Sequence, residues 1–371
     1  MIRLECLGAK FGDCIVLHYE NGAAKARVLF DGGPPGVYST FLKPWLDKDR
    51  AASGHTPRFA LGMVTHIDKD HINGLMQLTD EAVDKQQNGE AQNSPAKFDA
   101  FWFNSFTGLT KNTLANVNTA AITASVSGPG ADEHMFNDHR SFAIIASVQE
   151  GHQLSNNLGA LGLGSNGGLN EMVLAGHKRT IAPGLVFRVV GPDKKRLMAL
   201  RKLWDKTIPI GELAATMDPS VPNLSSIVLL AEAKVEGEAE DKKILMTGDA
   251  MALDIVKWLE ESGDLPAGGG KLKLDVLKMP HHGSARNVTQ DMLERLPARL
   301  YIFSADGTHD NPDLETMDIL AAARPDNDFK IVLASPLKTP ELQDALVAKM
   351  EEHNFNFTFR AEDELSVMVE V

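Results

Sequence analysis

Cysteine is scarce in this chain of 371 residues, in which Cys6 and Cys14 are the only two. Two thiols close to the N-terminus cannot form the disulfide framework of a small secreted protein, and they exclude a cysteine-based zinc module. Positive charge is also scarce, because 37 lysine and arginine residues stand against 50 aspartate and glutamate residues and leave a net charge of −13. This balance argues against a protein that coats nucleic acid or anionic membrane through a broad basic face.

Long hydrophobic runs are missing as well. The first residues carry charge and lack the apolar core of a secretory signal. The stretch of lowest charge, residues 154–174, is interrupted by glycine and asparagine and is unsuited to a membrane-spanning helix. Because 43% of the residues are hydrophobic, the chain can still bury a sizeable core. We therefore expect a soluble, cytoplasmic protein with no membrane partner.

Short apolar runs rich in β-branched residues alternate with helix-like stretches along the chain. The runs typical of strands are residues 14–19, 26–30, 59–64, 185–190, 226–231, 243–246, 274–279, 300–303 and 330–334. The helix-like stretches are residues 40–46, 72–77, 194–204, 252–261, 289–295, 313–322 and 339–353. This interleaving predicts an α/β fold.

Residues 81–180 differ from the sequence around them. They are poor in strand signals and rich in glycine, alanine, asparagine and serine. We interpret them as an insertion of helix and loop within one catalytic domain that spans residues 1–371. The two strand-rich parts on either side of the insertion would suit a sandwich of two sheets, and the acidic segment 232–242 is expected to be a hairpin loop.

The densest chemical signal lies in residues 65–74, directly after a strand-like run. This segment contains His66, Asp68, Asp70 and His71. Imidazole nitrogens and carboxylate oxygens are ligands of zinc and related divalent ions. Alternation in an extended loop would send His66, Asp68 and Asp70 in one direction, while Asp70 and His71 at a helix start could serve a second ion.

Two further polar motifs also follow strand-like runs. Asp249 comes shortly after the run 243–246, and the pair His281–His282 follows the run 274–279. Either motif alone is a weak signal, because an aspartate at a strand end is ordinarily a cap or turn former. Together with the segment 65–74 they predict a site at the rim of a sheet.

In this order, the motifs resemble those of the metallo-β-lactamase superfamily. The resemblance is carried by Leu7-Gly8 through Gly12-Asp13, Asp31-Gly32-Gly33, the ligand loop, Thr247-Gly248-Asp249 and His281-His282-Gly283-Ser284. Asp68 in place of the usual histidine, with Lys278-Met279-Pro280 before His281, looks most like the hydrolase domain of the competence protein ComEC and its free-standing relatives. That domain is associated with DNA degradation during uptake. The resemblance implies an αββα sandwich with a metal site at the edge of the two sheets.

The resemblance also implies two divalent metal ions, zinc or manganese. Their ligands would be His66, Asp68 and Asp249 for the first ion, and Asp70, His71, Asp249 and one of His281 and His282 for the second, with Asp249 bridging. We favour His282 because it stands two residues before Ser284, but the sequence leaves this choice open. Asp31 looks like a carboxylate that orients a ligand imidazole.

One position departs from the superfamily pattern. Asn223 stands where a further histidine usually precedes a strand. With Asp68 and Asn223 in place of two imidazoles, the first ion would have His66 as its only nitrogen ligand. Such a site is harder and less selective for zinc, which makes manganese a serious candidate.

The expected activity is hydrolysis of a phosphodiester by a metal-activated water, with Asp70 and Asp249 in the catalytic centre. Short or single-stranded nucleic acid and nucleotides are the preferred substrates, because the net charge of −13 disfavours long duplexes. Arg286 and Lys278 could bind phosphate, and His309 could line the substrate site, protonate a leaving group or cap the next helix. The alternatives are a lactonase or β-lactamase-like hydrolase of a neutral cyclic substrate, and a non-catalytic metal-binding regulatory protein. The oligomeric state cannot be predicted.

Overall fold

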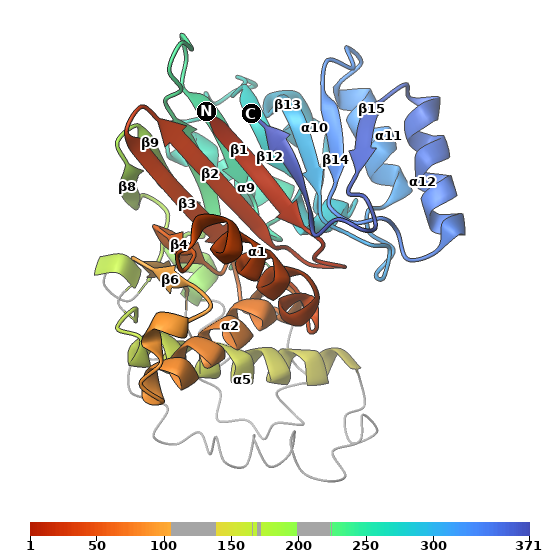
Figure 1. The fold of residues 1–371 in the computed structure, drawn as a ribbon. Coiled ribbons are helices and arrows are strands. Elements are labelled where there is room, and N and C mark those ends of the chain that lie inside the picture. The colour runs from red at the N-terminus through yellow and green to blue at the C-terminus, as the bar shows by residue number, and fades with distance from the viewer. Residues whose placement is uncertain (105–138, 165, 169–171, 199–222, 224) are drawn as a thin grey trace.

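The structure is a computed structural model that describes residues 1–104, 139–164, 166–168, 172–198, 223 and 225–371. Two large β-sheets dominate it (Figure 1). The first sheet has the order β16-β1-β2-β3-β5-β7 and the second the order β15-β14-β13-β12-β11-β10-β9-β8. A small third sheet pairs β4 (Arg58–Phe59) with β6 (Lys97–Phe98). The mixed α/β class predicted from the sequence is confirmed.

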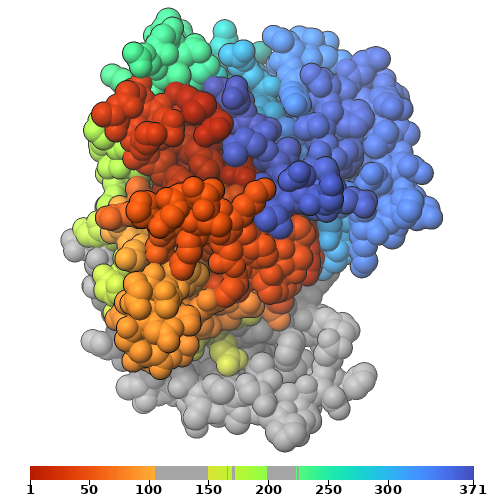
Figure 2. Space-filling view, in the orientation of Figure 1, coloured from red at the N-terminus to blue at the C-terminus, as the bar shows by residue number. Residues whose placement is uncertain are grey.

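The first sheet is antiparallel from β16 to β3 and parallel from β3 to β7. Its strands are β1 (Ile2–Leu7), β2 (Ile15–Asn21), β3 (Ala24–Phe30), β5 (Leu61–Met63), β7 (Phe101–Trp102) and β16 (Ser366–Glu370). In register, Arg3 faces Glu370 and Leu7 faces Ser366. The last strand of the chain therefore forms the edge of the sheet beside the first strand, and Figure 2 shows the red N-terminal and blue C-terminal residues side by side.

The second sheet is antiparallel from β8 to β11 and parallel from β11 to β15. Its strands are β8 (Lys178–Ala182), β9 (Leu185–Gly191), β10 (Val228–Ala233), β11 (Lys242–Met246), β12 (Leu274–Lys278), β13 (Ala298–Phe303), β14 (Lys330–Leu333) and β15 (Asn356–Phe359). Both faces of its central strands are largely buried, so these strands are rich in apolar residues. The hairpin predicted at residues 232–242 joins β10 to β11.

Helices cover the outer face of each sheet, while the inner faces pack against each other. On the first sheet lie the π-helix η1 (Tyr38–Leu42), α1 (Lys43–Ser53), α2 (Lys69–Gln87) and α5 (His139–Ala160). On the second lie α9 (Ala252–Glu261), α10 (Gln290–Arg295), α11 (Leu314–Ala323) and α12 (Pro340–Glu352). Short helices occur at η2 (Ala91–Asn93), η5 (Asn166–Gly168) and η6 (Pro280–Gly283).

Three apolar clusters hold these layers together. The central cluster lies between the sheets, where the rings of Phe30 and Phe187 stack at 6.0 Å. Alternation along a strand divides side chains between clusters, because Ile244 of β11 faces the other sheet and Leu245 faces the helices. Burial of these side chains is the main driving force for the arrangement.

Each predicted strand run contains a strand, and each predicted helical stretch contains helix, although residues 199–204 of one stretch lie outside the described residues. The ends predicted for the insertion, residues 81 and 180, fall inside α2 and β8. Within it, β7 extends the first sheet and α5 packs along α2. No helix in the described ranges is both long enough and apolar enough to cross a membrane.

Candidate metal centre

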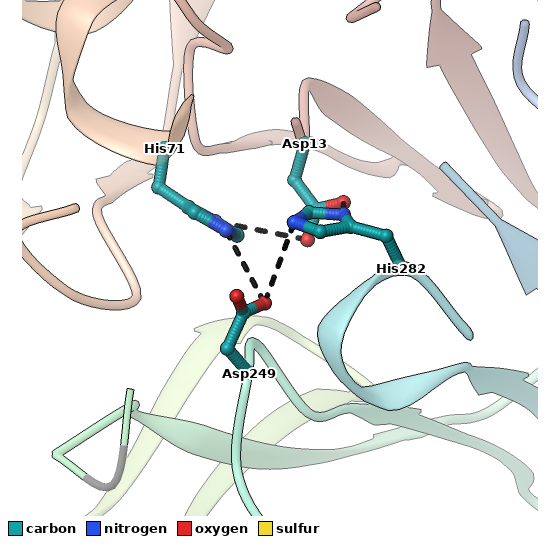
Figure 3. Close-up of side chains that lie close together, drawn as sticks. All are labelled: Asp13, His71, Asp249 and His282. Carbon is teal, nitrogen blue, oxygen red and sulfur yellow. Dashed lines mark ion pairs between the residues drawn. The ribbon is translucent and has the colours of Figure 1, made fainter. Parts of the chain in front are cut away.

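A group of buried acidic and histidine side chains lies where several strands of both sheets end. Asp13, His71, Asp249 and His282 come from four separate segments and point toward one another (Figure 3). One potential ligand atom from each lies within 4.8 Å of those of the other three. This buried group could hold a metal ion.

The carboxylate of Asp249 lies at the middle of a wider cluster. Its Oδ1 is 3.2 Å from Nε2 of His71 and 3.6 Å from Nε2 of His282. Its Oδ2 is 3.5 Å from Nε2 of His281 and 3.8 Å from Nε2 of His66. The two oxygens thus face two different pairs of imidazoles.

The carboxylates of the ligand loop divide between the same two sides. Asp70 Oδ2 is 3.3 Å from Nε2 of His282 and 3.9 Å from Nε2 of His71. Asp68 Oδ2 is 3.8 Å from Nε2 of His66. One side therefore contains Asp70 with two imidazoles, and the other contains Asp68 with two imidazoles.

Buried atoms without hydrogen-bond partners converge on this cluster. In the described part of the chain, Nε2 of His66, His71 and His282 and Oδ1 of Asp249 are buried and lack a hydrogen-bond partner of good geometry. Buried polar atoms in proteins are nearly always bonded. Unpaired imidazole nitrogens beside an unpaired carboxylate oxygen form the donor set that divalent metal ions prefer, so these residues fit a metal ion.

The opposite nitrogen of each ring is held by a neighbouring side chain. His71 Nδ1 donates to Asp31 Oδ2 at 2.9 Å, and Asp31 is itself fixed by the backbone N–H and hydroxyl of Thr65. His66 Nδ1 lies 3.1 Å from Oγ1 of Thr65. When Nδ1 carries the proton, Nε2 presents its lone pair to a metal. Asp31 therefore lies where an orienting carboxylate was predicted.

Close backbone packing brings Asp31 and His71 together. The N–H of Gly32 donates to the carbonyl of His71 at 2.7 Å. A Cβ atom added at Gly74 would lie 1.9 Å from the carbonyl oxygen of Gly32, so a larger residue would separate α2 from the end of β3. The sequence Asp31-Gly32-Gly33 thus allows the helix that carries His71 to approach the sheet.

The electrostatics of the cluster favour a bound cation. Burial lowers the pKa of His66 to about 3, so this ring is neutral and available as a ligand. Burial also lowers the pKa of His71, but Asp249, Asp31 and Asp70 outweigh it and raise this pKa well above its ordinary value. The same competition between burial and Asp249 raises the pKa of His282 to about 9. The carboxylates therefore attract positive charge to the centre.

Asp13, for which the sequence predicted no role, lies behind His282. Asp13 Oδ1 is 3.3 Å from Nδ1 of His282, on the opposite side of the ring from Asp249. Asp13 also pairs with Nζ of Lys278 at 2.6 Å and accepts a hydrogen bond from Ser304. Because its oxygens are occupied in this way, we assign Asp13 to orienting His282. Its position after Gly12 in the N-terminal motif was the only available signal.

The prediction that Lys278 binds phosphate was wrong. Lys278 is fully buried at the end of β12, and its ammonium group faces Asp13. A substrate in solution cannot reach it. The sequence could not show this burial, because it depends on Asp13, a partner that is distant in the chain.

The remaining predicted residues lie around the centre or outside it. Arg286 is exposed on the turn that follows η6. His309 is exposed and contacts the ring of Phe11. Asn223 is partly buried, and its Oδ1 has no hydrogen-bond partner in the described residues. His281 remains 33% exposed, and both it and His282 have a positive φ, a conformation that is uncommon for histidine and often occurs at functional sites.

No protein-family model matches the chain, and no curated protein matches it.

Proposed function

We propose that the protein is a metal-dependent phosphodiesterase with a sandwich of the metallo-β-lactamase type. The observation that carries the proposal is the position of Asp249, whose two carboxylate oxygens face two separate sets of imidazoles and carboxylates. The sequence resemblance supports it, as does the order of layers, with helices on the outer face of each of two packed sheets.

Two sets of residues would hold two ions. The second-ion set is Asp70, His71, His282 and Oδ1 of Asp249. The first-ion set would be His66, Asp68 and Oδ2 of Asp249, and we add His281 because its Nε2 lies 3.5 Å from that oxygen. When bound, two divalent ions would activate water at neutral pH and stabilise negative charge on a phosphodiester.

The residues around the ligands would supply orientation and exclude water. Asp31 and Asp13 fix the rings of His71 and His282 from behind. The side chains of His66 and His71 are completely buried, whereas Asp68 and Asp70 are 26% and 21% exposed. A substrate would therefore reach the centre past these two carboxylates and the partly exposed His281.

A phosphodiester suits this centre better than a neutral ring does. Its negative charge would be attracted to the bound ions, whereas a lactam or lactone gains less in its ground state. The net charge of −13 disfavours a long duplex held by many phosphate contacts. We therefore propose short or single-stranded nucleic acid, or a nucleotide, as the substrate.

The first-ion side would decide the preference between zinc and manganese. Asp68 provides an oxygen ligand, and an oxygen of Asn223 would add another. His281 would add a second imidazole beside His66, which strengthens the case for zinc. We propose that both metals support activity.

The test is a set of parallel hydrolysis assays with protein loaded with Mn²⁺ or Zn²⁺. The substrates are bis(p-nitrophenyl) phosphate, single-stranded DNA, and a chromogenic lactam and lactone, with Asp249→Asn as the inactive comparison. Hydrolysis of the phosphodiesters that is lost in the variant supports the proposal. Turnover of only the lactam or lactone would favour the neutral cyclic substrate, and tight metal binding without turnover would favour a regulatory protein.

A further inference from the structure

Two loops beside the metal centre bring an aromatic ring and an imidazole together. The loop 8–14 joins β1 to β2 and contains Phe11, and the loop 304–313 joins β13 to α11 and contains His309. The two rings meet edge to face, with centroids 4.9 Å apart and planes at 81°. Phe11 is half-buried and His309 is exposed, so part of this ring pair is open to solvent.

A backbone hydrogen bond links the first loop to Asp70. The backbone N–H of Asp13 donates to the carbonyl oxygen of Asp70 at 3.3 Å. A Cβ atom at Gly12 would lie 2.0 Å from the same oxygen, so only glycine permits this approach. Phe11 therefore directly precedes the residues, Gly12 and Asp13, that contact the backbone of the proposed metal ligand Asp70.

Polar contacts link the second loop to His281 and His282. At its start, Oγ of Ser304 lies 3.4 Å from Nδ1 of His282. Near its end, Nδ2 of Asn311 donates to the carbonyl oxygen of His281 at 3.3 Å. His309 thus belongs to a loop that leaves the centre at one histidine and returns at the other.

Both anchors belong to the part of the centre that solvent reaches. The side chains of Asp70 and His281 are 21% and 33% exposed, whereas Asp249 is 2% exposed. Because one loop is tied to Asp70 and the other to His281, the ring pair stands at the rim of this accessible part.

We propose that Phe11 and His309 form a stacking platform for a nucleobase beside the phosphate that is cleaved, in which the base lies against the face of one ring and meets the other, nearly perpendicular ring at its edge. This inference rests on the proposed phosphodiesterase function. It adds that the substrate must carry a nucleobase next to the phosphodiester. Stacking on aromatic rings tolerates any base, and it provides affinity without additional phosphate contacts. In a protein with a net charge of −13, phosphate contacts contribute little to affinity, so stacking would supply binding energy that they cannot.

The test compares a short fluorescent oligothymidylate with an abasic strand of the same length. Both strands have phosphorothioate linkages, which slow hydrolysis, and binding to the metal-loaded protein is followed by fluorescence anisotropy. We expect wild type to bind the base-bearing strand about tenfold more tightly. Phe11→Leu, which keeps an apolar side chain, should remove this preference, and Phe11→Trp should keep it. His353→Ala is the matched control, because His353 lies beyond α12 and pairs with Asp318.

The outcomes separate this inference from the proposed function. Equal affinity of wild type for both strands, or equal losses for both strands in Phe11→Leu, would overturn the platform. Cleavage of unmodified strands without any base preference would also overturn it, while the proposed function would stand. A base preference in binding without hydrolysis of any phosphodiester would support the platform and overturn the proposed function.

Discussion

Asp13 and Lys278 form a buried ion pair that joins the two sheets, with Oδ2 of Asp13 2.6 Å from Nζ of Lys278. Asp13 precedes β2 of the first sheet, and Lys278 ends β12 of the second. Since Asp13 also contacts Nδ1 of His282, the pair connects the packing of the sheets to the orientation of one proposed ligand. The charge of each partner is compensated only by groups inside the protein.

Replacing Lys278 by methionine should destabilise the protein strongly. It removes the main cation that compensates the buried carboxylate of Asp13 and leaves only the ring of His282 beside it, and breaking comparable pairs costs about 3–5 kcal/mol. The double variant Asp13→Asn with Lys278→Met should recover part of this loss, as denaturant unfolding of the metal-free proteins would show. Additive losses would mean that the two residues are not coupled. Lys242→Met, at a lysine 3.6 Å from Asp275, is the matched control.

Asp249→Asn should lower both the metal content and the proposed hydrolase activity. Asp249 faces both sets of ligands, and loss of a residue that merely orients a ligand already costs about 10- to 100-fold in metal affinity or activity. We expect metal affinity and the rate of phosphodiester hydrolysis each to fall by at least about a hundredfold. Elemental analysis after dialysis would detect the lost metal. Asp318→Asn, at a surface aspartate that pairs with Lys349, should change neither. Full metal content in Asp249→Asn would exclude it as a bridging ligand.

His281→Ala and His282→Ala should affect different ions of the proposed pair. His282 lies with His71 on the Oδ1 side of Asp249, and His281 lies with His66 on the Oδ2 side. Calorimetric titration with zinc should therefore show that each variant weakens a different one of two binding steps, by about 10- to 100-fold. If both variants weaken the same step, the two oxygens of Asp249 do not serve separate ions.

Glu5→Gln should reduce stability at neutral pH but not at low pH. Burial raises the pKa of Glu5, but hydrogen bonds from His18, Ser366 and Trp45 outweigh it and lower this pKa below its ordinary value of 4.5. The stabilisation is therefore fully present above about pH 4.5 and is lost as the pH falls through the folded-state pKa.

Denaturant unfolding across this pH range would measure the effect. The difference from wild type should be about 1–3 kcal/mol at pH 7 and should shrink below pH 4.5. Glu20→Gln, at a surface glutamate that pairs with Lys25, is the matched control. A difference that stays constant with pH would show that the charge of Glu5 is not responsible.

Much of the architecture could be predicted because its central strands are buried on both faces. Runs such as residues 300–303 are apolar enough to identify without tertiary information. The edge strands β15 and β16 were not predicted, since their residues are largely half-buried or exposed and their apolar pattern is weak. β1, which alternates apolar residues with Arg3 and Glu5, was not among the predicted strand runs either.

The candidate site was predictable only where its residues follow such runs. His66, Asp249 and His282 each come shortly after a buried strand, so their position at the sheet rim could be inferred. The roles of Asp13 and Lys278 could not, because each depends on a partner that is distant in the chain. The division of His281 and His282 between two sides of Asp249 likewise depends on side-chain positions within the turn.

The pairing of β16 with β1 has a consequence for the kinetics of folding. Ser366 donates a hydrogen bond to Glu5, which is 361 positions away in the sequence. Contacts between distant segments form slowly, because chain entropy is lost before they contribute stability. The centre also needs segments from both sheets, so we expect it to assemble late in refolding. Until then the unpaired edge of β1 would be exposed to other chains, and aggregation should compete with refolding as protein concentration rises.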